Sequence, residues 1–230
     1  MNLSFATMTV YALVTILTFI FVKIFSLNNR TFLAPLIFGN TGNIGLPLSY
    51  FAFGAEGLDY AVVIFALMGI YAFTFGVWIV SGGGALIKTI KEPMVGATIL
   101  GALFLWQGWE TPQFITSTCE LVGQMAIPLM LITLGVAIAR LKPHNLFKAT
   151  GYAFVKLTIC TVCSLLIAYL FSLSHIPMAI LILQLTTPVA VTSYLIANKY
   201  EADSESVASL VIVSTILSIV YIPILLLFLI

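Results

Sequence analysis

The chain reads Phe38-Gly39-Asn40-Thr41-Gly42-Asn43-Ile44-Gly45-Leu46-Pro47 between two apolar segments, residues 32–37 and 48–53. A helix in a bilayer must satisfy its backbone amides internally, because lipid offers no hydrogen-bonding partners. Three glycines, two asparagines and a proline in one span therefore predict that the helix stops and restarts here. Secondary transporters build substrate sites from such breaks, which are tolerated only where protein or a water-filled cavity surrounds them.

The composition places the chain in a membrane. Of its 230 residues, 61% are hydrophobic and only 7% are charged, whereas about 25% of a soluble domain is charged. A net charge of +1 gives no support for nucleic-acid binding. Cys119, Cys160 and Cys163 are too few for a disulfide framework, and the C-x-x-C pair lies in an apolar stretch, which favours packing over redox chemistry.

Eight stretches are candidates to cross the bilayer, for which about 20 apolar residues are needed. They are residues 3–25, 32–53, 58–80, 93–109, 114–139, 146–170, 176–198 and 204–230. The fourth is short, and Pro93 suits its first helical turn because the missing N–H costs nothing there. The sequence thus predicts one all-α, multi-pass membrane domain.

The cations alternate with the predicted loops. Eight of the nine Lys and Arg residues fall at the first, third, fifth and seventh loops: Lys23, Arg30, Lys88, Lys91, Arg140, Lys142, Lys148 and Lys199. By the positive-inside rule this side is cytoplasmic. We therefore predict a cell-membrane protein (inner membrane in a bacterium) with both termini outside. The ninth cation, Lys156, lies inside the sixth span.

The acids avoid the centres of all the predicted spans. A retinal protein with its Schiff base at Lys156 is disfavoured, because it would need a buried carboxylate counter-ion. An aspartyl intramembrane protease is excluded, because it would need paired aspartates within the spans. A proton relay through membrane carboxylates is disfavoured for the same reason. No set of residues suits covalent catalysis, so we predict that the protein is not an enzyme and uses neither cofactor nor metal.

A weaker copy of the break occurs in the seventh span, at residues 184–192. Phe25-Ser26-Leu27 precedes the first broken span and Phe171-Ser172-Leu173 the second; Ser49-Tyr50 and Ser193-Tyr194 follow the two breaks. The copies should run in opposite directions, which is the logic of inverted repeats. We assign residues 1–81 to an incomplete first repeat, its last three helices. Residues 82–91 are assigned to a cytoplasmic linker and 92–230 to a five-helix second repeat.

The stretch from Asn40 to Leu48 resembles the N-T-G-x-x-G-L-P-L signature of the auxin efflux carrier family, whose plant members are the PIN proteins. Weaker similarities follow in the family's order: Glu92-Pro93, Ile127-Pro128-Leu129 with Leu134-Gly135, and Pro188 with the loop at 200–207. The resemblance implies a transporter of ten helices in two inverted repeats, with two broken helices crossing in a mobile transport domain. The eight spans match the family's third to tenth helices, so the scaffold is reduced to spans four and five.

The crossing predicts the substrate site. Positive ends of half-helices can hold an anion, so we expect a small organic anion, such as a carboxylate, as substrate. The predicted substrate-binding residues are Asn40, Thr41, Asn43, Thr186, Thr187 and Lys156, and the predicted hinge residues are Gly42, Gly45, Pro47 and Pro188. Thr192 offers a further hydroxyl, and Gln184 suits a hydrogen bond between helices.

Each of these residues also has a purely structural interpretation. Asn40 and Asn43 are good helix N-caps, and buried threonines often bond their own helix backbone. Lys156 either balances an anion, replaces a coupling cation, or extends its side chain toward the cytoplasm. Met130 is interpreted as packing.

Three functional hypotheses remain open at this stage. The first is a secondary carrier, a possible homodimer through its scaffold helices, with the lipid bilayer and an organic anion as partners. The second is a non-transporting fragment or a subunit that needs a partner. The third is a channel. The missing first two helices reflect either a true short form or a wrongly assigned start.

Overall fold

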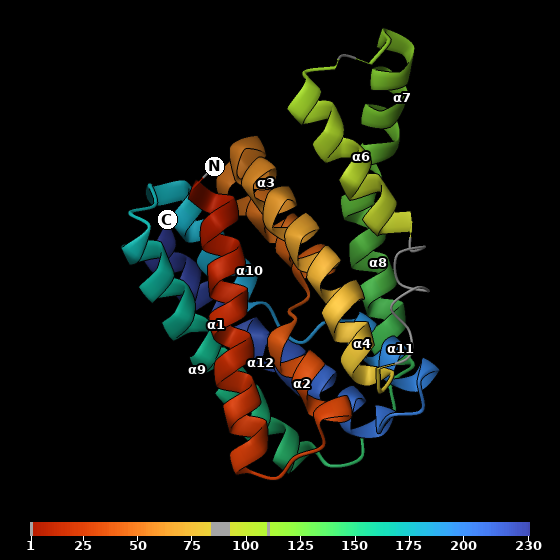
Figure 1. Ribbon diagram of the computed structural model, residues 1–230, viewed down its shortest axis with the longest axis vertical. Helices are drawn as coiled ribbons and strands as arrows, with labels where there is room; N and C mark the ends of the chain where they lie inside the picture. Colours follow the sequence, from red (N-terminus) through yellow and green to blue (C-terminus); the bar gives the residue numbers. More distant parts are fainter. Residues whose placement is uncertain (1, 84–92, 110) are drawn as a thin grey trace.

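The computed structural model describes residues 2–83, 93–109 and 111–230, which fold into helices (Figure 1). The helices are α1 (Asn2–Ile24), α2 (Asn29–Ile37), α3 (Leu46–Tyr71), α4 (Val77–Val80), α6 (Pro93–Gln107), α7 (Gln113–Gln124), α8 (Ala126–Ala139), α9 (Leu146–Leu170), α10 (His175–Thr186), α11 (Val191–Lys199) and α12 (Ser204–Leu229). Two π-helical turns, Thr41–Gly45 and Ala72–Gly76, lead into α3 and α4. The predicted all-α, multi-pass membrane fold is confirmed.

Five helical stretches in the described residues are long and apolar enough to cross a membrane: Asn2–Ile24, Thr41–Val80, Gln113–Ala139, Leu146–Leu170 and Ser204–Leu229. The difference from the eight predicted spans has physical reasons. The second and seventh spans are each interrupted, and α6 has only 15 residues. The stretch Thr41–Val80 contains a sharp corner at Gly54 (φ 66°, ψ −155°), which separates the second predicted span from the third.

The core surrounds the second broken span. Every residue from 179 to 190 is buried, and α10 packs against α3, α9 and α12. By contrast, α7 and α8 contain no buried residue. In Figure 1 these two helices stand with α6 on one side of the molecule, away from α1 and α9. The chain thus has a well-packed bundle and a thin second layer.

The two halves of the chain turn their corners in the same way. Ser26 (φ 51°) ends α1 and Ser172 (φ 48°) ends α9, both in the left-handed region. In each case the next residue donates its N–H to a carbonyl five residues back, from Leu27 to Val22 (2.9 Å) and from Leu173 to Ala168 (3.1 Å). This is the Schellman ending of a helix. The matched tripeptides of the sequence therefore mark the same turn.

Hydrogen bonds bring the cation-bearing loops to one end of the molecule. Arg30, before α2, donates from Nε to the Val80 carbonyl (2.9 Å) and from a terminal nitrogen to the Tyr200 carbonyl (2.7 Å). Figure 1 shows both chain termini at the opposite end. Lys88, Lys91, Glu92 and most of the predicted linker lie outside the described residues. The grouping suits the predicted alternation; which end faces the cytoplasm remains a prediction.

Candidate functional site

The two breaks cross and pair with each other. Asn40 donates its backbone N–H to the Pro188 carbonyl (2.7 Å), and Ala190 donates to the Phe38 carbonyl (3.3 Å). Gly39 and Val189 thereby form an isolated antiparallel bridge. Each break satisfies backbone groups that the other leaves open, which is what irregular backbone at membrane depth requires.

Small residues allow this close approach. A Cβ placed on Gly39 would overlap the Thr187 hydroxyl and lie 3.2 Å from the Thr187 carbonyl oxygen. A Cβ on Gly45 would overlap the side-chain amide of Gln184, which donates to Ser49 Oγ at 3.3 Å. The predicted interhelical bond of Gln184 is therefore present. This hydrogen bond joins the last turn of α10 to the first turn of α3.

The prolines flank the two breaks. Pro47 lies in the first turn of α3, where a proline is tolerated because its missing N–H has no partner in the helix. Pro188 follows Thr187, the residue that caps the C-terminus of α10. A proline at this point cannot continue the helix, so the chain must leave α10 before α11 begins.

A cavity of about 150 Å³ opens beside the first break. Two helices begin at this cavity. One is the π-turn that leads into α3, with Asn40 at its N-cap position, and the other is α11, with Ala190 at its N-cap position. The wall opposite comes from the later part of α3 and from Met130 of α8. The whole cavity is lined by Gly39, Asn40, Thr41, Gly42, Asn43, Phe65, Met68, Gly69, Ala72, Phe73, Met130, Ala190 and Thr192.

Polar atoms at this cavity are left without protein partners. Asn40 Oδ1 accepts the N–H of Asn43 (3.3 Å), as expected of an N-cap. In the described residues, neither Asn40 Nδ2 nor Thr41 Oγ1 has a hydrogen-bond partner, although Asn40 is 6% exposed and Thr41 is fully buried. Buried polar groups are almost always hydrogen-bonded, so these two atoms point to a further partner. The N-termini of both half-helices add partial positive charge at the same place.

The other three predicted substrate residues lie elsewhere. Lys156, Thr186 and Thr187 line a second, very small cavity of about 10 Å³ between α9, α10 and α12. The Thr186 hydroxyl donates to the Ile182 carbonyl (2.8 Å) and that of Thr187 to the Gln184 carbonyl (2.7 Å). Both threonines therefore bond their own helix. The structure brings Asn40, Thr41 and Asn43 together and separates them from this second group.

Two kinds of lining residue escaped the sequence analysis. Phe65 and Gly69 belong to an apolar stretch that carries no polar mark, and Met130 was interpreted as packing. Met130 directly follows the Ile127-Pro128-Leu129 motif, which is the signal that could have placed it at the crossing. Thr192, weighed only as a further hydroxyl, lines the cavity.

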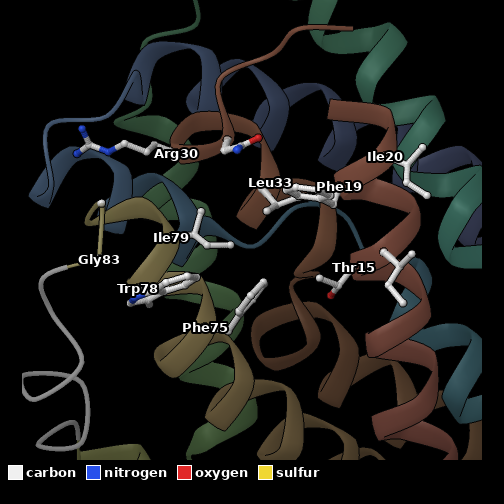
Figure 2. A pocket seen from close by; sticks show the side chains of 12 residues that line it. Thr15, Phe19, Ile20, Arg30, Leu33, Phe75, Trp78, Ile79 and Gly83 are labelled. Atoms are coloured by element: carbon white, nitrogen blue, oxygen red, sulfur yellow. The ribbon is translucent and has the colours of Figure 1, made fainter. Parts of the chain in front are cut away.

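A larger cavity of about 620 Å³ lies between α1, α2 and α4 (Figure 2). Its walls are mostly hydrocarbon, including Phe19, Phe75 and Trp78, with Arg30 at one edge. None of the predicted substrate residues lines it. The smaller cavity at the crossing is the better candidate site, because it combines helix N-termini with unpartnered polar atoms.

Known proteins support the membrane assignment. A family described as "Membrane transport protein" matches residues 79–226. The chain is 28% identical over 193 residues to an uncharacterized transporter of Methanothermobacter thermautotrophicus. It is 24% identical over 199 residues to an uncharacterized transporter of Methanocaldococcus jannaschii. Each similarity covers 80% of this chain, which spans 63% of the length of the relative.

Proposed function

Because this chain belongs to the membrane transport protein family, the auxin efflux carriers that its first break resembles, we propose that it carries a small organic anion across the membrane. The anion, such as a carboxylate, binds in the cavity beside the first break. The observation that carries this proposal is the pair of buried, unpartnered groups, Asn40 Nδ2 and Thr41 Oγ1, at the N-terminus of the first π-turn, in a cavity that is also lined at the N-terminus of α11.

The chemistry of the site suits a carboxylate. The Asn40 amide and the Thr41 hydroxyl can both donate, and bonds to a charged acceptor are roughly twice as strong as neutral ones. The amides that begin a helix have no acceptor within it and favour negative charge. Water occupies about 30 Å³ per molecule in the liquid, so a cavity of about 150 Å³ suits a ligand of a few non-hydrogen atoms.

The two layers of the fold support a mechanism of alternating access. The crossing residues belong to the well-packed bundle, whereas Met130 belongs to the thinly packed α8. Movement of the bundle past α8 would open the cavity to one side of the membrane and then to the other. The anion travels with the crossing, because most residues that line the cavity belong to the bundle.

The first experiment measures thermal unfolding of the purified protein against a panel of small carboxylates. Wild type is compared with Asn40→Ala and with Asn198→Ala, an exposed asparagine at the other end of α11. An anion at about 100 times its Kd should add roughly 2.7 kcal/mol of apparent stability. We expect the shift in wild type and Asn198→Ala and its loss in Asn40→Ala. An unchanged shift in Asn40→Ala would remove this site from consideration.

A flux assay separates a carrier from a channel. In vesicles loaded with the anion that stabilises the protein, uptake of labelled anion should saturate and be accelerated by unlabelled anion inside. Linear, non-saturating flux without such exchange would favour the channel.

One observation favours a second candidate, a subunit completed by a partner. No residue of α7 or α8 is buried, although Met130 of α8 lines the site. Cys119 on α7 is exposed, whereas Cys160 and Cys163 are buried. A thiol cross-linker applied in membranes should therefore report on α7 alone. Cross-linked dimers that vanish in Cys119→Ser, together with anion binding only in the dimer, would favour this candidate.

A further inference from the structure

Lys156 places a charged amine at the second break. It lies ten residues after the start of α9 and is 3% exposed. Its Nζ donates to the Thr187 carbonyl (3.0 Å) and lies 4.0 Å from Cys160 Sγ. Lysines in membrane helices normally extend toward the surface, but this side chain turns inward to the crossing. A buried membrane cation is a functional candidate by default.

The ammonium occupies the negative end of a half-helix. Thr187 caps the C-terminus of α10, where the last carbonyls lack partners within the helix and carry partial negative charge. The preceding carbonyl, of Thr186, accepts from Tyr221 Oη at 2.6 Å. In secondary transporters, half-helix C-termini and unwound carbonyls coordinate the coupling cation. In this protein, the side chains of Lys156 and Tyr221 donate to these carbonyls instead.

Among the residues that the structure describes, no acidic side chain forms a salt bridge with Lys156. The cavity around Lys156 measures about 10 Å³, which is at or below the space that a single water needs. The site therefore has a cation already in place and no room for a second, hydrated one.

We propose that Lys156 is a built-in counter-cation, whose ammonium holds the position of a coupling metal cation and balances the anion at the crossing. This inference rests on the proposed function for the anion. Its consequence is that wild type binds the anion without sodium, and that removing the ammonium frees the Thr187 carbonyl for a metal cation.

The experiment compares three substitutions. Lys156→Ala removes the charge and leaves space at the carbonyls, whereas Lys156→Met removes the charge but fills the space. Lys148→Ala, an exposed lysine in the first turn of the same helix, is the matched control. Thermal unfolding is measured in sodium, lithium, potassium and choline chloride, each with and without the stabilising carboxylate.

In the absence of carboxylate, sodium or lithium should raise the unfolding temperature of Lys156→Ala above its value in choline. Wild type, Lys156→Met and Lys148→Ala should show no such difference. This arm tests the cation position even if no carboxylate binds, so its failure is distinct from failure of the proposed function. A Lys156→Ala protein that folds but is insensitive to every metal cation overturns the proposal.

With carboxylate in choline, we expect anion affinity to fall about tenfold in both Lys156 variants, the order of effect of one charge in a partly buried setting. Sodium should restore it in Lys156→Ala only. Wild type alone provides a test if the alanine variant does not fold. A carboxylate shift in wild type that requires sodium, or an unchanged shift in Lys156→Met, contradicts a built-in counter-cation.

Discussion

The half-helices α2 and α10 end at the same crossing but in different surroundings. The end of α2, at Phe38, lies among aromatic rings: its ring centroid is 5.5 Å from that of Tyr71 and 6.5 Å from that of Tyr11. The end of α10 instead meets two polar side chains, Lys156 and Tyr221, which donate to its last carbonyls. The C-terminus of α2 therefore lies beside aromatic rings, whereas that of α10 accepts a hydrogen bond from the Lys156 amine.

The chain segments within the two breaks differ in the opposite sense. In the second break, the Val189 N–H donates to Ser214 Oγ of α12 (3.0 Å), so the chain is held within the protein. At the first break, Asn40 and Thr41 keep polar atoms without partners in the described residues. The backbone of the second break is thus bonded to α12, whereas two buried side-chain atoms of the first break have no partner in the described residues, a property they share with Gln184 Oε1 of α10. Four sets of substitutions test this difference.

Gly39→Val should have the largest effect, because its Cβ would overlap the Thr187 hydroxyl and lie only 3.2 Å from the Thr187 carbonyl oxygen. We expect a loss of about 3 kcal/mol or more of unfolding free energy, or roughly 10 °C in unfolding temperature. Gly151→Ala is the control, since a Cβ there meets nothing within 4 Å. If Gly39→Val unfolds at the temperature of Gly151→Ala, the tight crossing is wrong.

Asn40→Asp separates capping from anion binding. Aspartate caps a helix as well as asparagine does, and a helix N-terminus favours its charge, so the unfolding temperature should stay near that of wild type. The added carboxylate should repel the anion and weaken binding about 100-fold, because like charges in contact cost several kcal/mol. Titration calorimetry measures the affinity, with Asn198→Asp as control. Unaltered affinity would leave Asn40 with capping alone.

Ser214→Ala tests the support of the second break. It removes the acceptor of the Val189 N–H and should cost about 1–2 kcal/mol, the penalty for an unpaired buried donor. Ser218→Ala is matched to it, because Ser218 lies one turn later in α12 and bonds only the Thr215 carbonyl of its own helix. Equal unfolding temperatures for the two variants would contradict the assigned role of Ser214.

The smallest expected effect is the difference in anion affinity between Thr41→Val and Thr186→Val. Thr41→Val removes a buried hydroxyl that has no partner, so we expect stability to be equal or higher by up to about 1 kcal/mol. Anion affinity should fall about fivefold, or about 1 kcal/mol. Thr186→Val removes a bond within its own helix and should leave the affinity unchanged. Parallel denaturation and binding curves would show whether the two threonines behave alike.

The sequence predicts the breaks well because their causes are local. Glycine, asparagine and proline act on their own backbone, so the interruption at residues 38–40 follows from residue types. The corner at Gly54 lies between the second and third predicted spans. The matched turns at Ser26 and Ser172 are local because hydrogen bonds between residues at most five positions apart close them. The predicted pairing of the second and seventh spans needed only their order and direction.

The partners of individual side chains could not be predicted in this way. Lys156 meets the Thr187 carbonyl across 31 positions of sequence, and Asn40 meets that of Pro188 across 148. These contacts depend on how helices pack, which residue type does not determine. The six predicted substrate residues therefore divide between two cavities, although every one of them carries a hydrogen-bond donor suited to an anion.

Arg30 has a mechanical consequence. Its two hydrogen bonds join the start of α2 to the end of α4 and to the end of α11, which belongs to the other half of the chain. Sliding α2 past α11 would break the bond to Tyr200, which is strengthened by the guanidinium charge. These two helices of the bundle should therefore travel together, and spin labels on α2 and α11 should keep one separation throughout the transport cycle.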